Sequence, residues 1–465
     1  MARHSSRTWP TTPSAAHTSP VNKPQPLLRV LGLSFGLAVT VGNTIGAGIL
    51  RTPGDIAALL PSPWLFVGIW IVGAFYGLLG ANSLAELGTM LPRSGGQYIF
   101  ARHAFGNYAG FLVGWIDWVS TSASTGAISF VIGESIASVV GLGHRAGSLV
   151  AMAVVVVFTT LLMHGTKMGD RAQRATSLAK AVALLALVGA CFLFAHRAHV
   201  VPAPEVFRSV APMTLFAAFL LAAQAVIYAY DGWSGPIYFS EELDDPGRQI
   251  PQSMFLGLLT VASIYLLINV AFIVAVPTTA LAGSPLAAAT VAQALFGDRG
   301  ELLVRLVVIV SLPSAVNACL LMASRVLFSV SRDGLGPPQA TRVNAGGTPV
   351  VALGLSGAVA LAFLATGTFE TMIAIAAFFF VANYSLSFVA VFVLRHREPE
   401  APRPYRAVGH PWSTAVVLLG SLGFLSSAVV ADRRNSLYAL GIVLLSYPVF
   451  RATRRGPSTD PSRSQ

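Results

Sequence analysis

Two stretches in which glycines and a proline interrupt apolar sequence decide the fold: residues 42–49 read GNTIGAGI and residues 228–236 read YAYDGWSGP. Glycine inside a helix is costly, and proline removes a backbone donor and clashes with the preceding turn. In a membrane, broken backbone is tolerated where it is buried in protein or lines a cavity. Small residues at a helix crossing are the alternative explanation for the first stretch. The second stretch, which adds Asp231 and Pro236, favours two broken membrane helices.

The composition excludes a typical soluble enzyme. The 465 residues are 54% hydrophobic and 11% charged, whereas soluble domains carry about 25% charged residues. Disorder over most of the chain is excluded as well, because it needs low hydrophobicity and high charge. The net charge of +11 does not indicate nucleic-acid binding, because most basic residues fall in loops on one side of the expected membrane. The sequence has no His and Cys spacing typical of a metal site and no phosphate-binding glycine loop, so no enzyme activity, metal or cofactor is expected.

Twelve segments are apolar enough to cross a membrane, which takes about 20 residues. The third is too long for one crossing, so part of it is expected to lie in a loop or to tilt. We therefore expect an all-α membrane protein with twelve transmembrane helices. The segments are 28–50, 63–86, 98–139, 147–166, 175–196, 212–241, 251–276, 302–330, 349–367, 369–394, 412–430 and 434–451.

The distribution of lysine and arginine orients the chain. With the N-terminus in the cytoplasm, most of the 30 basic residues fall in cytoplasmic segments. We therefore expect a multi-pass protein of the cytoplasmic membrane with both termini inside. Residues 1–27, rich in Ser, Thr and Pro, are expected to form a disordered cytoplasmic tail, and residues 452–465 a second cytoplasmic tail.

The two interrupted helices are the first and the sixth, so each opens a group of five helices. Five is odd, and the second group must therefore begin from the opposite face of the membrane, which gives an inverted repeat. We expect the first repeat over residues 28–200, the second over 201–394 and two peripheral helices over 395–451. Paired broken helices of this kind frame a binding site at the membrane midplane in many secondary transporters.

The broken ends of these helices have opposite polarity. Where helix 1 restarts after Gly48, free N–H groups and the positive end of the helix dipole suit a carboxylate. The carbonyl groups at the end of each first half-helix suit an ammonium group. An α-amino acid carries both groups, so it is the expected class of substrate.

Further stretches belong with these two segments: AELGTMLPRSGG at 85–96, EELDDP at 241–246, ASR at 323–325, RDG at 332–334 and RPYR at 403–406. Together they resemble the amino acid–polyamine–organocation transporters, in particular the L-type-like branch, from about residue 28 to residue 450. The resemblance implies twelve helices, of which ten form a five-plus-five inverted repeat with discontinuous helices 1 and 6.

The resemblance also implies two sets of substrate-binding groups. Backbone N–H groups for the carboxylate would come from Gly46, Ala47, Gly48 and Ile49. Carbonyl groups for the amine would come from Thr44, Ile45, Tyr228 and Ala229. Tyr228 also matches an aromatic residue that closes over the substrate in relatives, with a packing aromatic as the alternative interpretation.

Lys180 lies inside the fifth expected helix. A lysine that extends its ammonium group to the membrane surface is one interpretation. By resemblance, it is a lysine beside helix 1 whose ammonium group takes the place of a sodium ion in sodium-coupled relatives of this fold. Burial would make this lysine a proton-responsive group, so Lys180 is the expected coupling residue. Its role argues against sodium coupling and leaves proton symport and amino acid exchange open.

Acids and polar residues at membrane depth are functional hypotheses. Asp231, beside Gly232 in the second interrupted stretch, could attract the substrate amine, cap a helix or take part in proton transfer. For Asp117, a polar contact between helices is favoured over a role in coupling. The other residues of this kind are expected to form structural or gate-forming pairs near helix ends (Glu86, Glu134 and Arg325) or to link helices by hydrogen bonds (Asn317 and Asn383).

The expected function is sodium-independent secondary transport of amino acids by alternating access, as proton-coupled symport or as amino acid exchange. One alternative is a polyamine or organic-cation permease, which would need more acid than Asp231 alone. An alternative outside transport is a non-transporting membrane sensor that binds amino acids. The expected partners are an amino acid, the lipid bilayer and, in symport, protons, with no nucleic acid. The identity of the amino acid and the oligomeric state stay open.

Overall fold

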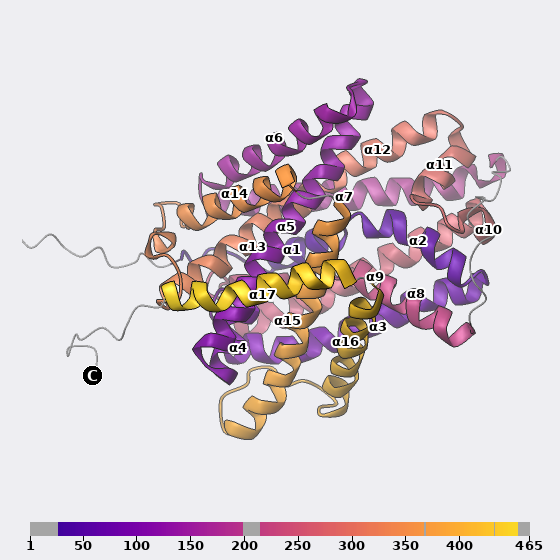
Figure 1. Ribbon diagram of the computed structural model, residues 1–465. Helices are drawn as coiled ribbons and strands as arrows, with labels where there is room; N and C mark the ends of the chain where they lie inside the picture. The colour runs from indigo at the N-terminus through magenta and orange to yellow at the C-terminus, as the bar shows by residue number, and fades with distance from the viewer. Residues whose placement is uncertain (1–26, 199–213, 367–368, 432, 454–465) are drawn as a thin grey trace, which may run out of the picture.

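A computed structural model describes residues 27–198, 214–366, 369–431 and 433–453 (Figure 1). Within those ranges all regular secondary structure is helical, apart from two isolated β-bridges. Nine helices in these ranges are long and apolar enough to cross a membrane, and one bent pair adds a tenth span if it is taken as one crossing. The fold is therefore that of a multi-pass helical membrane protein.

The first expected span is a bent pair of helices. α1 (Leu33–Thr44) and α2 (Gly48–Leu59) are separated by residues 45–47, and the two helices are bent by 45°. The predicted break is thus confirmed at the glycines that indicated it. The second half runs on to Leu59, beyond the expected end of this span at residue 50.

The sixth expected span is broken as well. α8 (Leu215–Ala229) ends at the YAYDGWSGP stretch, and residues 230–234 form turns. A short 3₁₀ helix, η3 (Gly235–Phe239), follows. Gly232 has a φ of +113°, which a residue with a side chain rarely adopts. The break therefore depends on a glycine at this position.

The third expected span divides into two helices. α4 (Gln97–Phe105) is short, and Gly106 separates it from α5 (Asn107–Val140). Segment 98–139 is thus divided, and α5 alone is the candidate membrane span of this region. The arginine, histidine and tyrosine side chains of α4 give it an amphipathic character that α5 does not share.

The eighth expected span contains α12 (Arg299–Ser311) and α13 (Pro313–Arg332), which meet at Leu312. Two short helices that the sequence did not predict precede it, α10 (Thr278–Leu281) and α11 (Ala287–Phe296). The other helices are α3 (Pro63–Met90), α6 (His144–Leu162), α7 (Thr166–Phe194), α9 (Pro246–Ala275), α14 (Val350–Thr366), α15 (Phe369–Arg397), α16 (Trp412–Ala431) and α17 (Arg433–Thr453).

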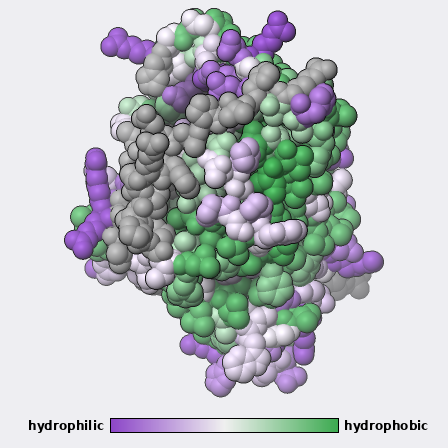
Figure 2. Space-filling view, turned by 90° about the vertical axis from the view of Figure 1, so that its right-hand side faces the viewer, coloured by the Kyte–Doolittle hydropathy of each residue, from purple (hydrophilic) through white to green (hydrophobic). Residues whose placement is uncertain are grey.

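The broken helices pack against several other helices of the bundle. α1 contacts α7, α9, α13 and η3, and α2 contacts α8. α5 packs against α6, α13, α14 and α15 beside them. On the face drawn in Figure 2, hydrophobic residues cover much of the middle, and the most hydrophilic side chains stand at the edges. The expected tails, 1–27 and 452–465, lie almost entirely outside the described residues.

Candidate functional site

The start of α2 presents backbone donors to the break in helix 1. The first N–H groups of a helix have no acceptor within it, and the cap residue Ala47 makes no side-chain hydrogen bond to them. The N–H of Gly46 donates to Thr44 O at 2.9 Å, so Gly46 is not the free donor that was expected. The N–H groups of Ala47, Gly48 and Ile49 have no backbone acceptor among the described residues. A Cβ added at Gly46 would meet no atom within 4 Å. Space for a ligand therefore adjoins these donors.

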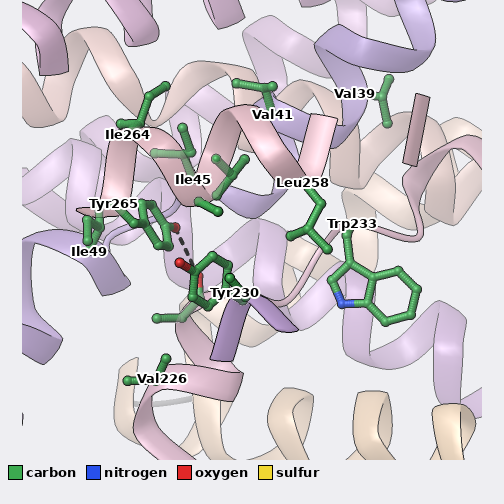
Figure 3. Packing of buried hydrophobic residues seen from close by; sticks show 14 of the residues in the cluster. Val39, Val41, Ile45, Ile49, Val226, Tyr230, Trp233, Leu258, Ile264 and Tyr265 are labelled. Atoms are coloured by element: carbon green, nitrogen blue, oxygen red, sulfur yellow. Dashed lines mark hydrogen bonds between the residues drawn. The ribbon is translucent and has the colours of Figure 1, made fainter. Parts of the chain in front are cut away.

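Tyr265 bridges the carbonyl ends of both broken helices. Its hydroxyl oxygen lies 3.0 Å from Thr44 O and 2.9 Å from Ala229 O, the last residues of α1 and α8. The ring packs against Tyr230 with ring centroids 4.9 Å apart (Figure 3). It also packs against Trp70, with centroids 5.5 Å apart. Two carbonyl groups that the resemblance assigns to a substrate amine thus contact a neutral donor, and each keeps a second lone pair.

The two breaks touch each other. The side-chain amide of Asn43 donates to Gly232 O at 3.1 Å. A Cβ at residue 232 would lie 2.8 Å from the carbonyl carbon of Asn43 and from the nitrogen of Thr44. A Cβ at Gly48 would lie 3.4 Å from Cα of Ala229. The donor end of α2 therefore lies next to the acceptor end of α8.

Lys180 reaches the break in helix 1 from α7 and is fully buried. Its Nζ donates to Gly42 O at 2.7 Å and also to Ile45 O. The ammonium group thus lies at the carbonyl end of α1, where the helix dipole is negative. This position excludes the interpretation in which the side chain extends to the membrane surface.

Asp231 lies in the turn between α8 and η3. Its Oδ1 accepts a hydrogen bond from Tyr384 Oη of α15 at 2.7 Å. The Tyr384 hydroxyl lies 3.1 Å from Ser234 Oγ, and its ring stacks on Trp233 with centroids 5.1 Å apart. Tyr228 and Asp231 line a small cavity together with these two aromatic rings. α15 therefore orients the one acid that the sequence places in this break.

A cavity of about 590 Å³ leads from the protein surface to the start of α2. It lies between α2, α5, α11 and α12, and Ala47 and Leu50 are part of its wall. Charged side chains of both signs also line it, among them Arg51, Glu134 and Glu301. Its volume falls within the range of small-molecule sites, about 300–1,000 Å³. An amino acid therefore has room to approach the break from this side.

Ion pairs hold the helices together towards the C-terminal end of α13. Arg325 donates to both carboxylate oxygens of Glu242 at 2.9 and 2.8 Å, and both side chains are fully buried. Closer to the helix end, Asp333 pairs with Arg93 at 2.9 Å and with Arg102 at 2.5 Å. These pairs join α13 to α4, to the loop before α4 and to the loop after η3. The structure is therefore closed by charge pairing on this side.

Other predicted polar contacts have mixed outcomes. Glu86 is buried and accepts hydrogen bonds from Arg395 at 2.8 Å and Arg403 at 3.1 Å, which confirms the expected pairing. Asn317 links α13 to α7 by a hydrogen bond of 2.7 Å. The amide of Asn383 is buried and has no hydrogen-bond partner within the described part of the chain. Its expected link between helices is thus not formed.

The sequence reasoning missed four polar residues that organise this region: Asn43, Tyr238, Tyr265 and Tyr384. Asp117 makes the contact between helices that the sequence favours, and its partner is Tyr238 of η3. A polar side chain in an apolar helix is the one local signal that these residues carry. Their partners lie on other helices, so the sequence pattern does not identify them.

Comparisons with known proteins show which family the chain resembles in sequence. A sequence model of the family described as amino acid permease matches residues 28–448. The chain is 27% identical to the serine/threonine exchanger SteT of Bacillus subtilis over 92% of this chain and 98% of that protein. It is 26% identical to the b(0,+)-type amino acid transporter 1 of Mus musculus, over 87% of this chain and 84% of that protein.

A third relative is the large neutral amino acids transporter small subunit 2 of Homo sapiens, 27% identical over 82% of this chain and 72% of that protein. The family and these relatives are permeases and transporters, and none is an enzyme. The family match covers both helix breaks and most of the chain. The chain belongs to the amino acid permease family.

Proposed function

We propose that this protein is a secondary active transporter of amino acids that works by alternating access. The observation that carries the proposal is the contact between the two helix breaks, where the start of α2 at Gly48 lies against Ala229 at the end of α8. Backbone donors and acceptors of opposite polarity therefore lie within reach of one small zwitterion.

The substrate carboxylate binds at the start of α2. Ala47, Gly48 and Ile49 supply N–H groups to it, and Gly46 forms the wall beside them. The positive end of the helix dipole adds to this attraction. The 590 Å³ cavity at Ala47 supports the assignment, because it gives the carboxylate a path to these donors.

The substrate amine lies towards the carbonyl end of helix 1 and the break in helix 6. Tyr265 and Lys180 already donate to carbonyl groups there, including Thr44 O and Ile45 O, so the amine uses the second lone pairs together with Tyr228, Ala229 and Asp231. A carboxylate partner gives the amine a stronger, charge-assisted hydrogen bond. Serine and threonine are the first substrates to test, since SteT is named as an exchanger of these two amino acids.

Transport is independent of sodium. The Lys180 ammonium group already donates to Gly42 O and Ile45 O in the break of helix 1. A sodium ion would need these carbonyl oxygens as ligands and would be repelled by the positive charge. Proton-coupled symport and amino acid exchange are the two modes that remain.

Alternating access fits the asymmetry between the two ends of the bundle. One side carries the cavity that reaches Ala47, and the other is held by the buried pair of Glu242 and Arg325. We assign twelve transmembrane helices, with repeats over residues 28–200 and 201–394 that each open with a broken helix. With both termini in the cytoplasm of the cell, the cavity faces outward.

A polyamine or organic-cation permease is less well supported. Within the described residues, Asp231 is the one acid that lines the small cavity beside Tyr228. A polyamine carries several positive charges, and one carboxylate cannot pair with all of them. A membrane sensor that binds amino acids without transporting them has the same site, so it is separated from a transporter by experiment.

Uptake by the purified protein in liposomes tests the proposal. Radiolabelled L-serine is added outside, with unlabelled L-serine or no amino acid inside. We expect protein-dependent uptake that is unchanged when choline replaces sodium and unaffected by spermidine. Binding of L-serine without uptake would identify a sensor, and inhibition by spermidine with transport of spermidine would identify a polyamine permease.

A further inference from the structure

Asp117 is a buried acid that the proposed transport site does not use. It lies in α5 and is 0% exposed. Its Oδ1 and Oδ2 lie 3.1 and 3.0 Å from Tyr238 Oη, and Thr121 Oγ1 donates to Oδ1 at 3.4 Å. Each of these donors is neutral, and no ion pair to Asp117 is found in the part of the chain that the structure describes.

Few charged or titratable groups face Asp117 from the helices around it. Tyr238 of η3 contacts it, the Asp231 carboxylate acts on it by repulsion, and the Tyr384 hydroxyl of α15 lies within electrostatic range. From α4, the Tyr98 hydroxyl is directed away, to a carboxylate oxygen at 2.9 Å. Among the described residues, no charged group of α6, α12, α14 or α17 makes a hydrogen bond or ion pair with Asp117, whose partners are Tyr238 and Thr121.

The basic side chains of the helices packed on α5 have other partners. In α4, Arg102 pairs with Asp333. In α13, Arg325 pairs with Glu242 and Arg332 pairs with Glu241. In α15, Arg395 pairs with Glu86, and Arg397 donates to a backbone carbonyl oxygen. None of them is positioned to neutralise Asp117. A charge at this position is therefore balanced by hydroxyl groups alone.

A carboxylate that is removed from water without a cationic partner is unstable, and a second carboxylate nearby adds repulsion. A proton on Asp117 removes both costs. The carboxylate takes up one proton from water, and the new O–H group donates to Tyr238 Oη. No other bond changes, so the step is a simple binding of one proton.

Tyr238 connects this proton site to helix 6. Its carbonyl oxygen accepts a hydrogen bond from the N–H of Gly95 at 3.2 Å, and a Cβ at Gly96 would lie 2.4 Å from its ring. The two glycines of the LPRSGG stretch thus let the loop before α4 pack directly on η3. Movement of η3 away from α5 would remove the hydroxyl partner of Asp117 and admit water, which changes the stability of the carboxylate.

We propose that Asp117 is the proton-binding site of this protein and that Tyr238 couples its protonation to the position of the second half of helix 6. The inference rests on the proposed transport function, because it requires η3 to move during the transport cycle. It assigns the proton to α5, separately from Lys180 in α7. Tyr238 acts as a positioning residue for Asp117.

Infrared difference spectroscopy of the purified full chain tests this directly. Spectra are compared between about pH 6 and about pH 9, a range in which exposed carboxyl groups stay ionised. We expect a protonated-carboxyl band in the wild type that is lost in Asp117→Asn and kept in Asp231→Asn. Tyr238→Phe keeps the band but changes its frequency and titration midpoint, since the acid remains and its partner is lost. A band that is absent from the wild type, or that survives in Asp117→Asn, would overturn the inference.

Transport in liposomes gives a second readout that separates this inference from the proposed function. The wild type should accumulate L-serine when a pH gradient is imposed, and Asp117→Asn should lose this response while it keeps serine–serine exchange at equal pH. A wild type that moves no amino acid contradicts the proposed function, whatever its spectrum. A wild type that transports L-serine without any response to the gradient contradicts the coupling of Asp117 to transport and leaves the proposed function standing. If Asp117→Asn does not fold, Asp117→Glu should retain both the band and the response.

Discussion

Asn43 and Gly232 join the two broken helices. The side-chain amide of Asn43 donates to Gly232 O at 3.1 Å, and the missing side chain at residue 232 lets the two backbones approach. The contact brings the interrupted segments of both helices together. It fixes the donor end of one helix beside the acceptor end of the other, and the proposed amino acid site depends on that relationship.

Replacing Gly232 with alanine should disrupt the junction. The φ of +113° costs a residue with a side chain about 1–3 kcal/mol, and the new Cβ would lie 2.8 Å from the backbone of Asn43. We expect a lower melting temperature in detergent and loss of L-serine binding. The matched control is Gly189→Ala in α7, where a Cβ meets no atom within 4 Å. Normal L-serine affinity in Gly232→Ala would refute the role of the junction.

Tyr265→Phe should loosen both breaks while it preserves the packing of the ring. The variant loses the one hydroxyl proton that lies within hydrogen-bond distance of both Thr44 O and Ala229 O, and loss of such a hydrogen bond costs about 0.5–1.5 kcal/mol. We expect weaker L-serine binding and a modest loss of thermal stability. Tyr108→Phe is the control, because its hydroxyl contacts Ser446 of the peripheral helix α17. Equal effects of the two substitutions on L-serine affinity would contradict the assignment to Tyr265.

Lys180→Ala should cripple transport. The substitution leaves Gly42 O and Ile45 O without their charged donor, and loss of such a hydrogen bond is worth about 1.5–3 kcal/mol. We expect the initial rate of L-serine uptake to fall at least about tenfold, because a loss of about 1.5 kcal/mol corresponds to about that factor in rate. Lys167→Ala, an exposed lysine of the same helix, should transport normally. Wild-type rates of Lys180→Ala across the pH range would remove Lys180 from the transport mechanism.

The pattern of glycine, proline and charge was sufficient to predict the breaks, because it has a direct backbone cause. Gly46, Gly48 and Gly232 lie where helices end or begin, and Pro236 lies in the 3₁₀ helix that replaces an α-helical continuation. The length of the third expected segment also indicates that it is more than one membrane crossing. These features depend on neighbouring residues alone, so they can be predicted from the sequence.

The partners of the predicted residues could not be predicted. Tyr265 is 221 positions away from Thr44 in the sequence, and Tyr384 is 153 positions away from Asp231. Which helices pack together depends on tertiary structure that no periodicity encodes. The helices α10 and α11 were missed because residues 277–301 contain no apolar run long enough to cross a membrane.

Glu242→Gln should destabilise the closed side. The substitution leaves the buried Arg325 guanidinium without its counter-charge, which typically costs about 3–5 kcal/mol. We expect a large decrease in the melting temperature of the purified protein. Glu301→Gln is the control, because its pair with Arg305 is exposed and such pairs contribute about 0–1 kcal/mol. Similar melting temperatures for the two variants would show that the buried pair does not hold this end together.

Gly48→Val should abolish L-serine binding without preventing expression. A Cβ at residue 48 already lies 3.4 Å from Ala229, and the two methyl groups of valine extend into the space beside the N–H donors. Gly48→Ala adds the Cβ alone, which is an ordinary contact, and should bind with intermediate affinity. Equilibrium binding of radiolabelled L-serine to the purified variants measures both effects. Unchanged affinity in Gly48→Val would contradict the placement of the carboxylate.

The most direct measurement is an experimental structure of the protein with L-serine bound. We predict ligand density between the start of α2 and the end of α8, with the carboxylate within hydrogen-bond distance of the N–H groups of Ala47, Gly48 and Ile49 and the amine towards Asp231. Density for the amino acid elsewhere, or helices 1 and 6 that run on without a break through these glycines, would contradict it.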